Sequence, residues 1–151
     1  MIRKAVGAIV VTKNAYVLVC KSWQNTKDGK ERIEDEWDIA KGGVEREDET
    51  LEAAILRELY EETGSHAFTL RDQFTEKLTF AFPSEVKRKI GFTGQETTVF
   101  LVEFTGDLED LTPKDKEISK LKAVCPDELM DYLAHDETKQ FFRKYVLGDE
   151  C

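Results

Sequence analysis

The feature that most constrains the fold is the segment from Gly43 to Gly64, where a dense run of glutamates lies between two glycines. Gly64 is typical of the residue that ends a helix, and either Asp48 or Thr50 can cap its first turn. A helix turns by about 100° per residue, which places three apolar side chains on one face. These are Leu51, Ala54 and Ile55. The segment therefore predicts one core-facing helix after a glycine turn.

Three acids continue this apolar stripe. With Leu51 at zero, Glu58, Glu61 and Glu62 fall at roughly 340°, 280° and 20°. Carboxylates crowded at a buried face persist only when they are protonated, paired or bound to cations. Oxygen ligands suit Mg²⁺ or Mn²⁺ better than zinc. The alternative is an ordinary solvated helix face, as expected for many helices in a chain with 35% charged residues. The position beside the stripe favours a divalent metal site.

The spacing of these residues resembles the Nudix box, G-x5-E-x7-R-E-U-x-E-E-x-G-U, where U is a bulky aliphatic residue. The last position alone departs from it, being Ser65. The resemblance implies an α/β fold, an α/β/α sandwich with a mixed β-sheet, and Mg²⁺-dependent hydrolysis of phosphoanhydrides, with Mn²⁺ as a substitute. The matching positions are Gly43, Glu49, Arg57, Glu58, Leu59, Glu61, Glu62 and Gly64.

The resemblance also assigns roles to residues. It implies that Arg57 and the three helix glutamates are catalytic, with Arg57 and Glu49 expected to form an orienting pair. A carboxylate from a later loop is implied as a further ligand or general base, and Glu117 matches it; the alternative for Glu117 is an exposed acid in a charged loop. Which acid is the general base stays open, with Glu58 favoured. The implied metal site consists of the Gly42 carbonyl, Glu58, Glu61, Glu62 and Glu117.

The substrate is indicated by residues outside this motif. Phe82-Pro83 and the stretch 94–101 resemble the branch that holds dinucleoside polyphosphate hydrolases and bacterial RNA 5′-pyrophosphohydrolases. Basic residues would then contact the polyphosphate and two aromatic rings would stack on a base. A solvated loop is the alternative for the basic run, and core packing is the alternative for the rings. The implied substrate-binding residues are Arg3, Lys41, Lys87, Lys89, Phe80 and Phe82.

These residues leave several functions open. We expect hydrolysis of a nucleoside diphosphate-linked substrate, above all a dinucleoside polyphosphate such as diadenosine tetraphosphate. One alternative is an RNA 5′-triphosphate end, although Thr138 lies near the place where the RNA-processing enzymes carry a base-stacking aromatic residue. Another is a nucleoside triphosphate, nucleotide sugar or ADP-ribose. A non-catalytic nucleotide-sensing domain is the alternative from another class, and the retained glutamates argue against it.

Length and charge narrow the choice further. The 151 residues suit one domain, 1–151, built around one core. A net charge of −9 argues against binding to duplex DNA, because such binding depends on phosphate neutralisation by Lys and Arg. The three cysteines lack metal-ligand spacing, which is typical of reduced thiols in a cytoplasmic protein. The sequence has no long apolar run, so we expect a protein that does not enter a membrane. A monomer and a homodimer are both compatible with the sequence.

Runs of β-forming residues and helical periodicity predict a mixed sheet between helices. The predicted strands are Ala5–Thr12 and Tyr16–Cys20, joined as a hairpin, then Trp37–Ala40, Phe74–Phe82, Glu96–Phe104 and Leu121–Val124. Trp23–Glu36 and Pro83–Gly94 are predicted as loops, and Asp127–Leu133 and Glu137–Leu147 as helices.

Overall fold

A mixed β-sheet forms the centre of the computed structural model, which describes residues 1–147. Its central strand, β1 (Ile2–Thr12), runs parallel to β6 (Gly94–Phe104) and antiparallel to its other partners. Within the described residues the sheet has seven strands, in the order β3-β2-β1-β6-β5, with β4 paired to β1 and β7 to β2. The other strands are β2 (Ala15–Thr26), β3 (Gly29–Asp38), β4 (Ala40–Gly43), β5 (Phe68–Ala81) and β7 (Ile118–Val124).

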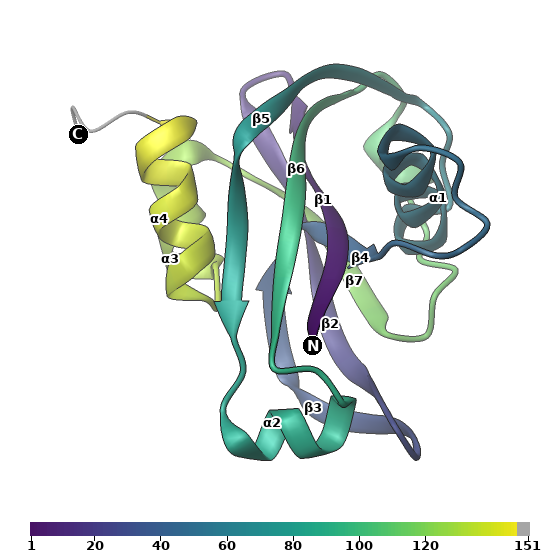
Figure 1. Cartoon of the computed structure of the whole chain (residues 1–151). Coiled ribbons are helices and arrows are strands. Elements are labelled where there is room, and N and C mark those ends of the chain that lie inside the picture. The colour runs from purple at the N-terminus through teal and green to yellow at the C-terminus, as the bar shows by residue number, and fades with distance from the viewer. Residues whose placement is uncertain (148–151) are drawn as a thin grey trace.

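Helices cover both faces of this sheet, as Figure 1 shows, with α1 (Leu51–Thr63) on one side and α3 (Leu129–Tyr132) and α4 (Asp136–Tyr145) on the other. Each side has its own apolar core. Ile55 and Leu59 of α1 pack on the first face, and Leu129 and Phe142 pack on the second. The expected α/β/α sandwich is therefore confirmed. The chain also forms two short 3₁₀ turns, η1 (Leu108–Asp110) and η2 (Pro126–Glu128).

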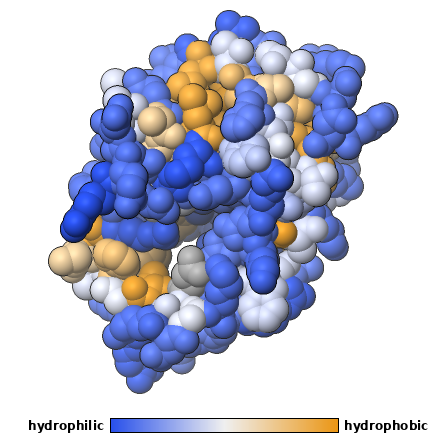
Figure 2. Space-filling view, turned by 90° about the vertical axis from the view of Figure 1, so that its right-hand side faces the viewer, coloured by the Kyte–Doolittle hydropathy of each residue, from blue (hydrophilic) through white to orange (hydrophobic). Residues whose placement is uncertain are grey.

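The boundaries of α1 follow from its sequence. The Thr50 side chain accepts a hydrogen bond from the backbone N–H of Ala53, which caps the first turn, as one of the two expected caps. At the other end Gly64 has φ of 73°, a left-handed conformation that favours glycine, and its N–H donates to the carbonyl of Tyr60. Figure 2 views the side of the molecule on which α1 lies, where hydrophilic residues cover most of the surface. No helix within residues 1–147 has the length and apolar character needed to cross a membrane.

Three expectations about local structure were wrong. Trp23–Glu36 is not a loop, because β2 and β3 continue through it as a hairpin whose polar residues lie on an exposed edge strand. The region predicted as the loop 83–94 contains a helix, α2 (Ser84–Ile90). Pro83 precedes this helix and the left-handed Gly91 follows it, and both residues are signals of helix ends in the sequence. The segment 127–133 forms a 3₁₀ turn and a short helix in place of one continuous helix.

Candidate functional site

The acids of α1 lie at different depths. Glu58 and Glu62 are buried, with 7% and 4% of their surfaces exposed, whereas the Glu61 side chain is 40% exposed. Positions 58 and 62 share the face that carries Ala54 and Ile55, since they follow one another at a spacing of four residues. The helix therefore holds two glutamates within its buried side and presents the third at the rim.

Arg57 ties this part of the helix to the glycine turn. Its guanidinium donates to both oxygens of Asp48, at 2.9 and 2.8 Å, and to the Gly43 carbonyl at 3.1 Å. It also donates to Glu58 at 2.9 Å and to Glu61 at 3.2 Å. The expected pair of Arg57 with Glu49 was therefore wrong: Asp48 is the partner, because it turns back toward the helix while Glu49 is exposed. Hydrogen bonds from Arg57 lower the pKa of Asp48.

The glycine turn touches one of the buried acids directly. A Cβ atom added to Gly42 would lie 2.2 Å from the carboxyl carbon of Glu58, so a side chain at this position would displace the Glu58 carboxylate. The Gly42 backbone and the Glu58 carboxylate are thus in close contact, although they lie far apart in the sequence. The backbone at the end of β4 can approach a bound group only because position 42 is glycine.

A loop that follows η1 brings further acids to the carboxyl end of α1. The N–H groups of Lys114 and Asp115 donate to the Glu61 carbonyl, and that of Thr112 donates to the Thr63 carbonyl. These bonds satisfy carbonyls that a helix end leaves without partners. Asp115 then accepts a hydrogen bond from the N–H of Glu117 at 2.9 Å. Glu117 is thereby held near the helix, with its side chain 15% exposed and 3.7 Å from Lys30.

Burial shifts the acid-base properties of this cluster. It raises the pKa of Glu58 to about 7, with the Arg57 hydrogen bond acting in the opposite direction and the Glu61 charge reinforcing it. Burial raises the pKa of Glu62 well above the usual value, and the Glu58 charge adds to this. Burial also raises the pKa of Glu117. Each of these carboxylates is more costly to ionise inside this protein than in water, and a nearby cation would reverse that cost.

The residues present suit a hard divalent cation. Glu62 Oε1 is buried with no hydrogen-bond partner among the described residues, which marks an oxygen able to accept a further ligand. The charges of Glu58, Asp115 and Glu117 act on this carboxyl group, and carboxylate oxygens are ligands that Mg²⁺ and Mn²⁺ take. Within residues 1–147 no three Asp, Glu, Cys or His side chains lie close enough together to hold a metal ion by themselves. Two carboxylates of the cluster, Glu58 and Glu61, are instead shared with the Arg57 guanidinium.

Arg3 lies beside the glycine turn. Its guanidinium occupies the space that a side chain at Gly43 would need, since an added Cβ would lie 2.7 Å from Arg3 Nη2. Arg3 Nη1 donates to Gln95 Oε1 at 3.0 Å, from the neighbouring position on β6. The buried Gln95 side chain donates in turn to Thr97. Arg3 is therefore held next to the residue that follows Gly42.

Lys41 and Phe80 meet on the sheet face opposite α1. The Lys41 ammonium lies 4.2 Å from the centroid of the Phe80 ring and 2.8 Å from an oxygen of Asp38. His135 approaches the same ring edge to face, with centroids 5.7 Å apart. Lys41 therefore covers one face of the Phe80 ring, so a base stacking on Phe80 would have to use the other face.

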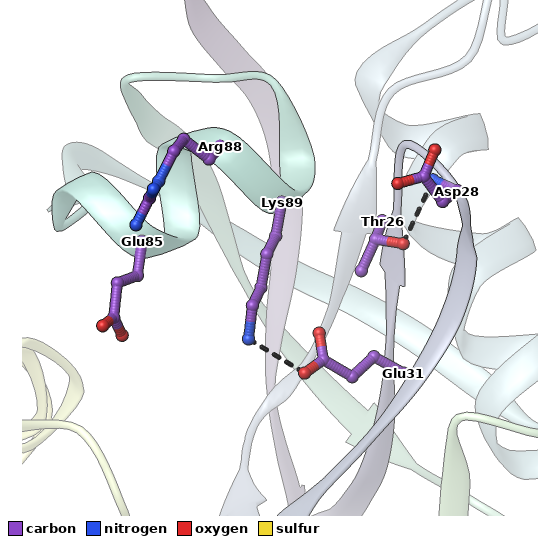
Figure 3. Close-up of a pocket in the computed structure, with 6 residues that line it drawn as sticks. All are labelled: Thr26, Asp28, Glu31, Glu85, Arg88 and Lys89. Atoms are coloured by element: carbon purple, nitrogen blue, oxygen red, sulfur yellow. Dashed lines mark hydrogen bonds and ion pairs between the residues drawn. The ribbon is translucent and has the colours of Figure 1, made fainter.

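The basic residues of α2 lie apart from this group. Lys89 Nζ pairs with Glu31 of the β2–β3 hairpin at 2.9 Å, and both line a cleft of about 570 Å³ between the hairpin and α2 (Figure 3). None of the α1 carboxylates lines this cleft. Lys87 is exposed in the last turn of α2, and Phe82 is half-buried in the segment before it. The structure thus does not gather Lys87, Lys89 and Phe82 around the acids.

Four residues near the site were not among the site residues that the sequence predicted. Asp48 lies one position from the motif acid, and Asp115 is one of several acids in a charged loop, so neither could be singled out. Lys21 faces the acids, because its charge acts on both Glu62 and Glu117. Asp38 is buried next to Lys41. Of these four residues, Asp38 alone could have been noticed in the sequence, because a charged residue stands there at the end of a β-rich run.

Comparison with known proteins places the chain in a family. The model of the NUDIX domain matches residues 1–145. The RNA pyrophosphohydrolase of Nitratiruptor is 29% identical over 76% of this chain and 70% of its own length. That of Campylobacter jejuni is 25% identical over 90% of this chain and 86% of its own length. The crystal structure of a C. elegans Ap4A hydrolase binary complex superposes with a TM-score of 0.69 at 18% identity, covering 97% of this chain and 96% of the other. The chain therefore belongs to the Nudix family and is a Nudix hydrolase.

Proposed function

We propose that this protein is a Mg²⁺-dependent hydrolase that cleaves a phosphoanhydride bond in a dinucleoside polyphosphate such as diadenosine tetraphosphate. The observation that carries the proposal is the buried pair of Glu58 and Glu62 beside Gly42, with an unpartnered oxygen on Glu62. Nudix hydrolases generally use divalent metal ions. Mn²⁺ is expected to substitute for Mg²⁺.

The free thiols of Cys20 and Cys125 suit the expected cytoplasmic location, while Cys151 lies outside the described residues.

The proposed metal ligands are the glutamates 58, 61, 62 and 117 and the Gly42 carbonyl. When bound there, the ion neutralises phosphate charge and lowers the pKa of the attacking water. Arg57 keeps Glu58 and Glu61 in place through hydrogen bonds to both. Glu58 is the favoured general base, because its carboxylate lies against the Gly42 backbone at the end of the glycine turn.

The arrangement of cations supports a compact polyphosphate as the substrate. Arg3 lies at Gly43 and Lys41 lies two positions earlier in the same strand, so both can face one short chain of phosphates. The basic run of α2 offers less to a long nucleic acid, because Lys89 is paired with Glu31 and the net charge is −9. Thr138 is buried at 1% exposure and cannot take the place of a base-stacking ring.

An RNA 5′-triphosphate end is the second candidate. The RNA pyrophosphohydrolases from Nitratiruptor and Campylobacter jejuni, which match most of this chain, favour it. Hydrolysis of a triphosphate end uses the same acids and the same two cations, so the two candidates differ only in what is attached to the phosphates. A direct comparison of substrates is therefore needed to separate them.

The test is product analysis with Mg²⁺ over a panel of diadenosine tetraphosphate, triphosphorylated RNA, nucleoside triphosphates, ADP-ribose and nucleotide sugars. We expect ATP and AMP from the first substrate and slow turnover of the others. Faster release of pyrophosphate from RNA would favour the second candidate, and preference for ADP-ribose would contradict both. The same reactions with EDTA should show no turnover.

Matched variants connect the activity to the site. Glu62→Gln keeps the shape of the side chain and removes the charge, so it should abolish turnover of the preferred substrate. Glu76→Gln changes an exposed acid of β5 and should leave turnover unchanged. Tight binding of nucleotide without turnover in the wild type would favour the sensing alternative.

A further inference from the structure

A buried ion pair lies on the sheet face opposite α1. Asp38, at the end of β3, is 4% exposed, and its Oδ2 lies 2.8 Å from Lys41 Nζ. Its Oδ1 accepts the N–H of Ile39 at 2.7 Å. The same Oδ2 is 3.9 Å from Nε2 of His135, which pairs more closely with Glu36, at 3.3 Å. Both oxygens of Asp38 therefore have partners, and its carboxylate is fixed in position.

This carboxylate determines where the Lys41 ammonium lies. A lysine side chain is a flexible four-carbon stem with a charged end, and it loses substantial conformational freedom when that end is held. Here the Lys41 side chain is 15% exposed and is held between Asp38 and the ring of Phe80. An ammonium carries three donors, so a phosphate oxygen can share the cation that Asp38 already holds.

The pair gives little stability by itself, because a buried ion pair often contributes no more than apolar residues of the same size. Its place in the sheet indicates another role. Successive residues of a strand point to opposite faces, so Lys41 and Gly43 share one face of β4 and Gly42 lies on the other. Arg3 fills the space beside Gly43. Asp38 thus holds the Lys41 cation on the face of β4 that also carries the Arg3 contact at Gly43, one residue from the Gly42 backbone that meets Glu58.

We propose that Asp38 is a positioning residue that holds Lys41 ready for the polyphosphate of the substrate. This inference rests on the proposed function, in which Lys41 binds that polyphosphate. Asp38 does not touch the substrate; it acts through Lys41, whose ordering is already complete before the nucleotide arrives. Removing the carboxylate leaves the charge on Lys41 but lets it move.

A double-mutant cycle tests this role. The kcat and KM for diadenosine tetraphosphate are measured for the wild type, Asp38→Asn, Lys41→Gln and the double variant. Asp38→Asn should raise KM about tenfold and change kcat by less than about twofold, with no further rise in KM in the Lys41→Gln background. Glu36→Gln, which alters the His135 pair and not Lys41, is the matched control and should leave KM unchanged. An unchanged KM in Asp38→Asn, or an equal effect in both backgrounds, would overturn the proposal.

A second measurement needs no change at position 38. In ¹⁵N-labelled wild-type protein, the Nζ signal of Lys41, assigned by its loss in Lys41→Gln, should exchange slowly with water and shift when β,γ-methylene-ATP is added. A signal lost to fast exchange would overturn the proposal even if Asp38→Asn does not fold. Failure of the wild type to hydrolyse any substrate of the panel would instead refute the proposed function, while the exchange rate would still report whether Asp38 holds Lys41.

Discussion

Replacing Glu58 by glutamine should stabilise the metal-free protein at high pH while destroying its activity. Burial raises the pKa of Glu58 from the ordinary 4.5 to about 7. Between these values the unfolded chain loses the proton of Glu58 while the folded protein keeps it. The free energy of unfolding therefore falls as pH rises through this window, and the loss is complete above pH 7. Glutamine carries no charge and still offers Arg57 an oxygen acceptor.

The magnitude follows from the size of this change in pKa. Moving a pKa from 4.5 to about 7 corresponds to about 3 kcal/mol, and this value already includes the opposing effect of the Arg57 hydrogen bond. Glu58→Gln in EDTA should thus be about 2 to 3 kcal/mol more stable than the wild type at pH 8 and nearly equal to it at pH 4.5. Added Mg²⁺ should stabilise the wild type more than the variant.

Urea unfolding followed by tryptophan fluorescence at a series of pH values measures this difference. Trp23 and Trp37 lie in the β2–β3 hairpin and provide the signal. Glu61→Gln is the control, because that side chain is 40% exposed and its neutral form should change stability little. A Glu58→Gln variant that is less stable than the wild type at pH 8, or a difference that does not depend on pH, would refute the reasoning.

Three further changes probe the frame around the acids. Gly42→Ala brings a Cβ atom within 2.2 Å of the Glu58 carboxyl carbon and should lower kcat/KM by about 100-fold or more, with circular dichroism unchanged. Arg57→Lys cannot keep the paired contacts of a guanidinium and should lower kcat about 10-fold to 100-fold in steady-state assays. Thr50→Ala removes the side-chain cap on the N–H of Ala53 and should cost about 1 kcal/mol in urea unfolding, with kcat preserved. Unchanged activity in the first two, or unchanged stability in the third, would contradict these contacts.

The helix and its acids could be predicted because they depend on local rules. The cap at Thr50, the left-handed Gly64 and the burial of Glu58 and Glu62 all follow from spacing along one helix. The β2–β3 hairpin was missed because an exposed edge strand carries charged residues in place of the alternation that marks a half-buried strand. The helix α2 was missed because its basic run resembled a loop, although Pro83 and Gly91 enclose it.

Contacts between distant segments could not be read from spacing. Asp48 and Glu49 are adjacent acids, and only the path of the loop decides which one reaches Arg57. The contact of Lys41 with Phe80 joins strands that are far apart in sequence. The hydrogen bonds from the N–H groups of Lys114 and Asp115 to the Glu61 carbonyl likewise join a late loop to the end of α1. A sequence lists the charges, whereas the pairing of those charges depends on the sheet topology.

The parallel pairing of β1 with β6 has a consequence for biosynthesis. Ile2 pairs with Gly94 and Val11 with Glu103. About 90 further residues must therefore be synthesised before β6 can pair with the second edge of β1. During translation α1 emerges well before that partner, while its two inward glutamates are still hydrated and ionised. Packing of α1 against the completed sheet then buries those acids and raises their pKa, so folding of this chain should be sensitive to pH.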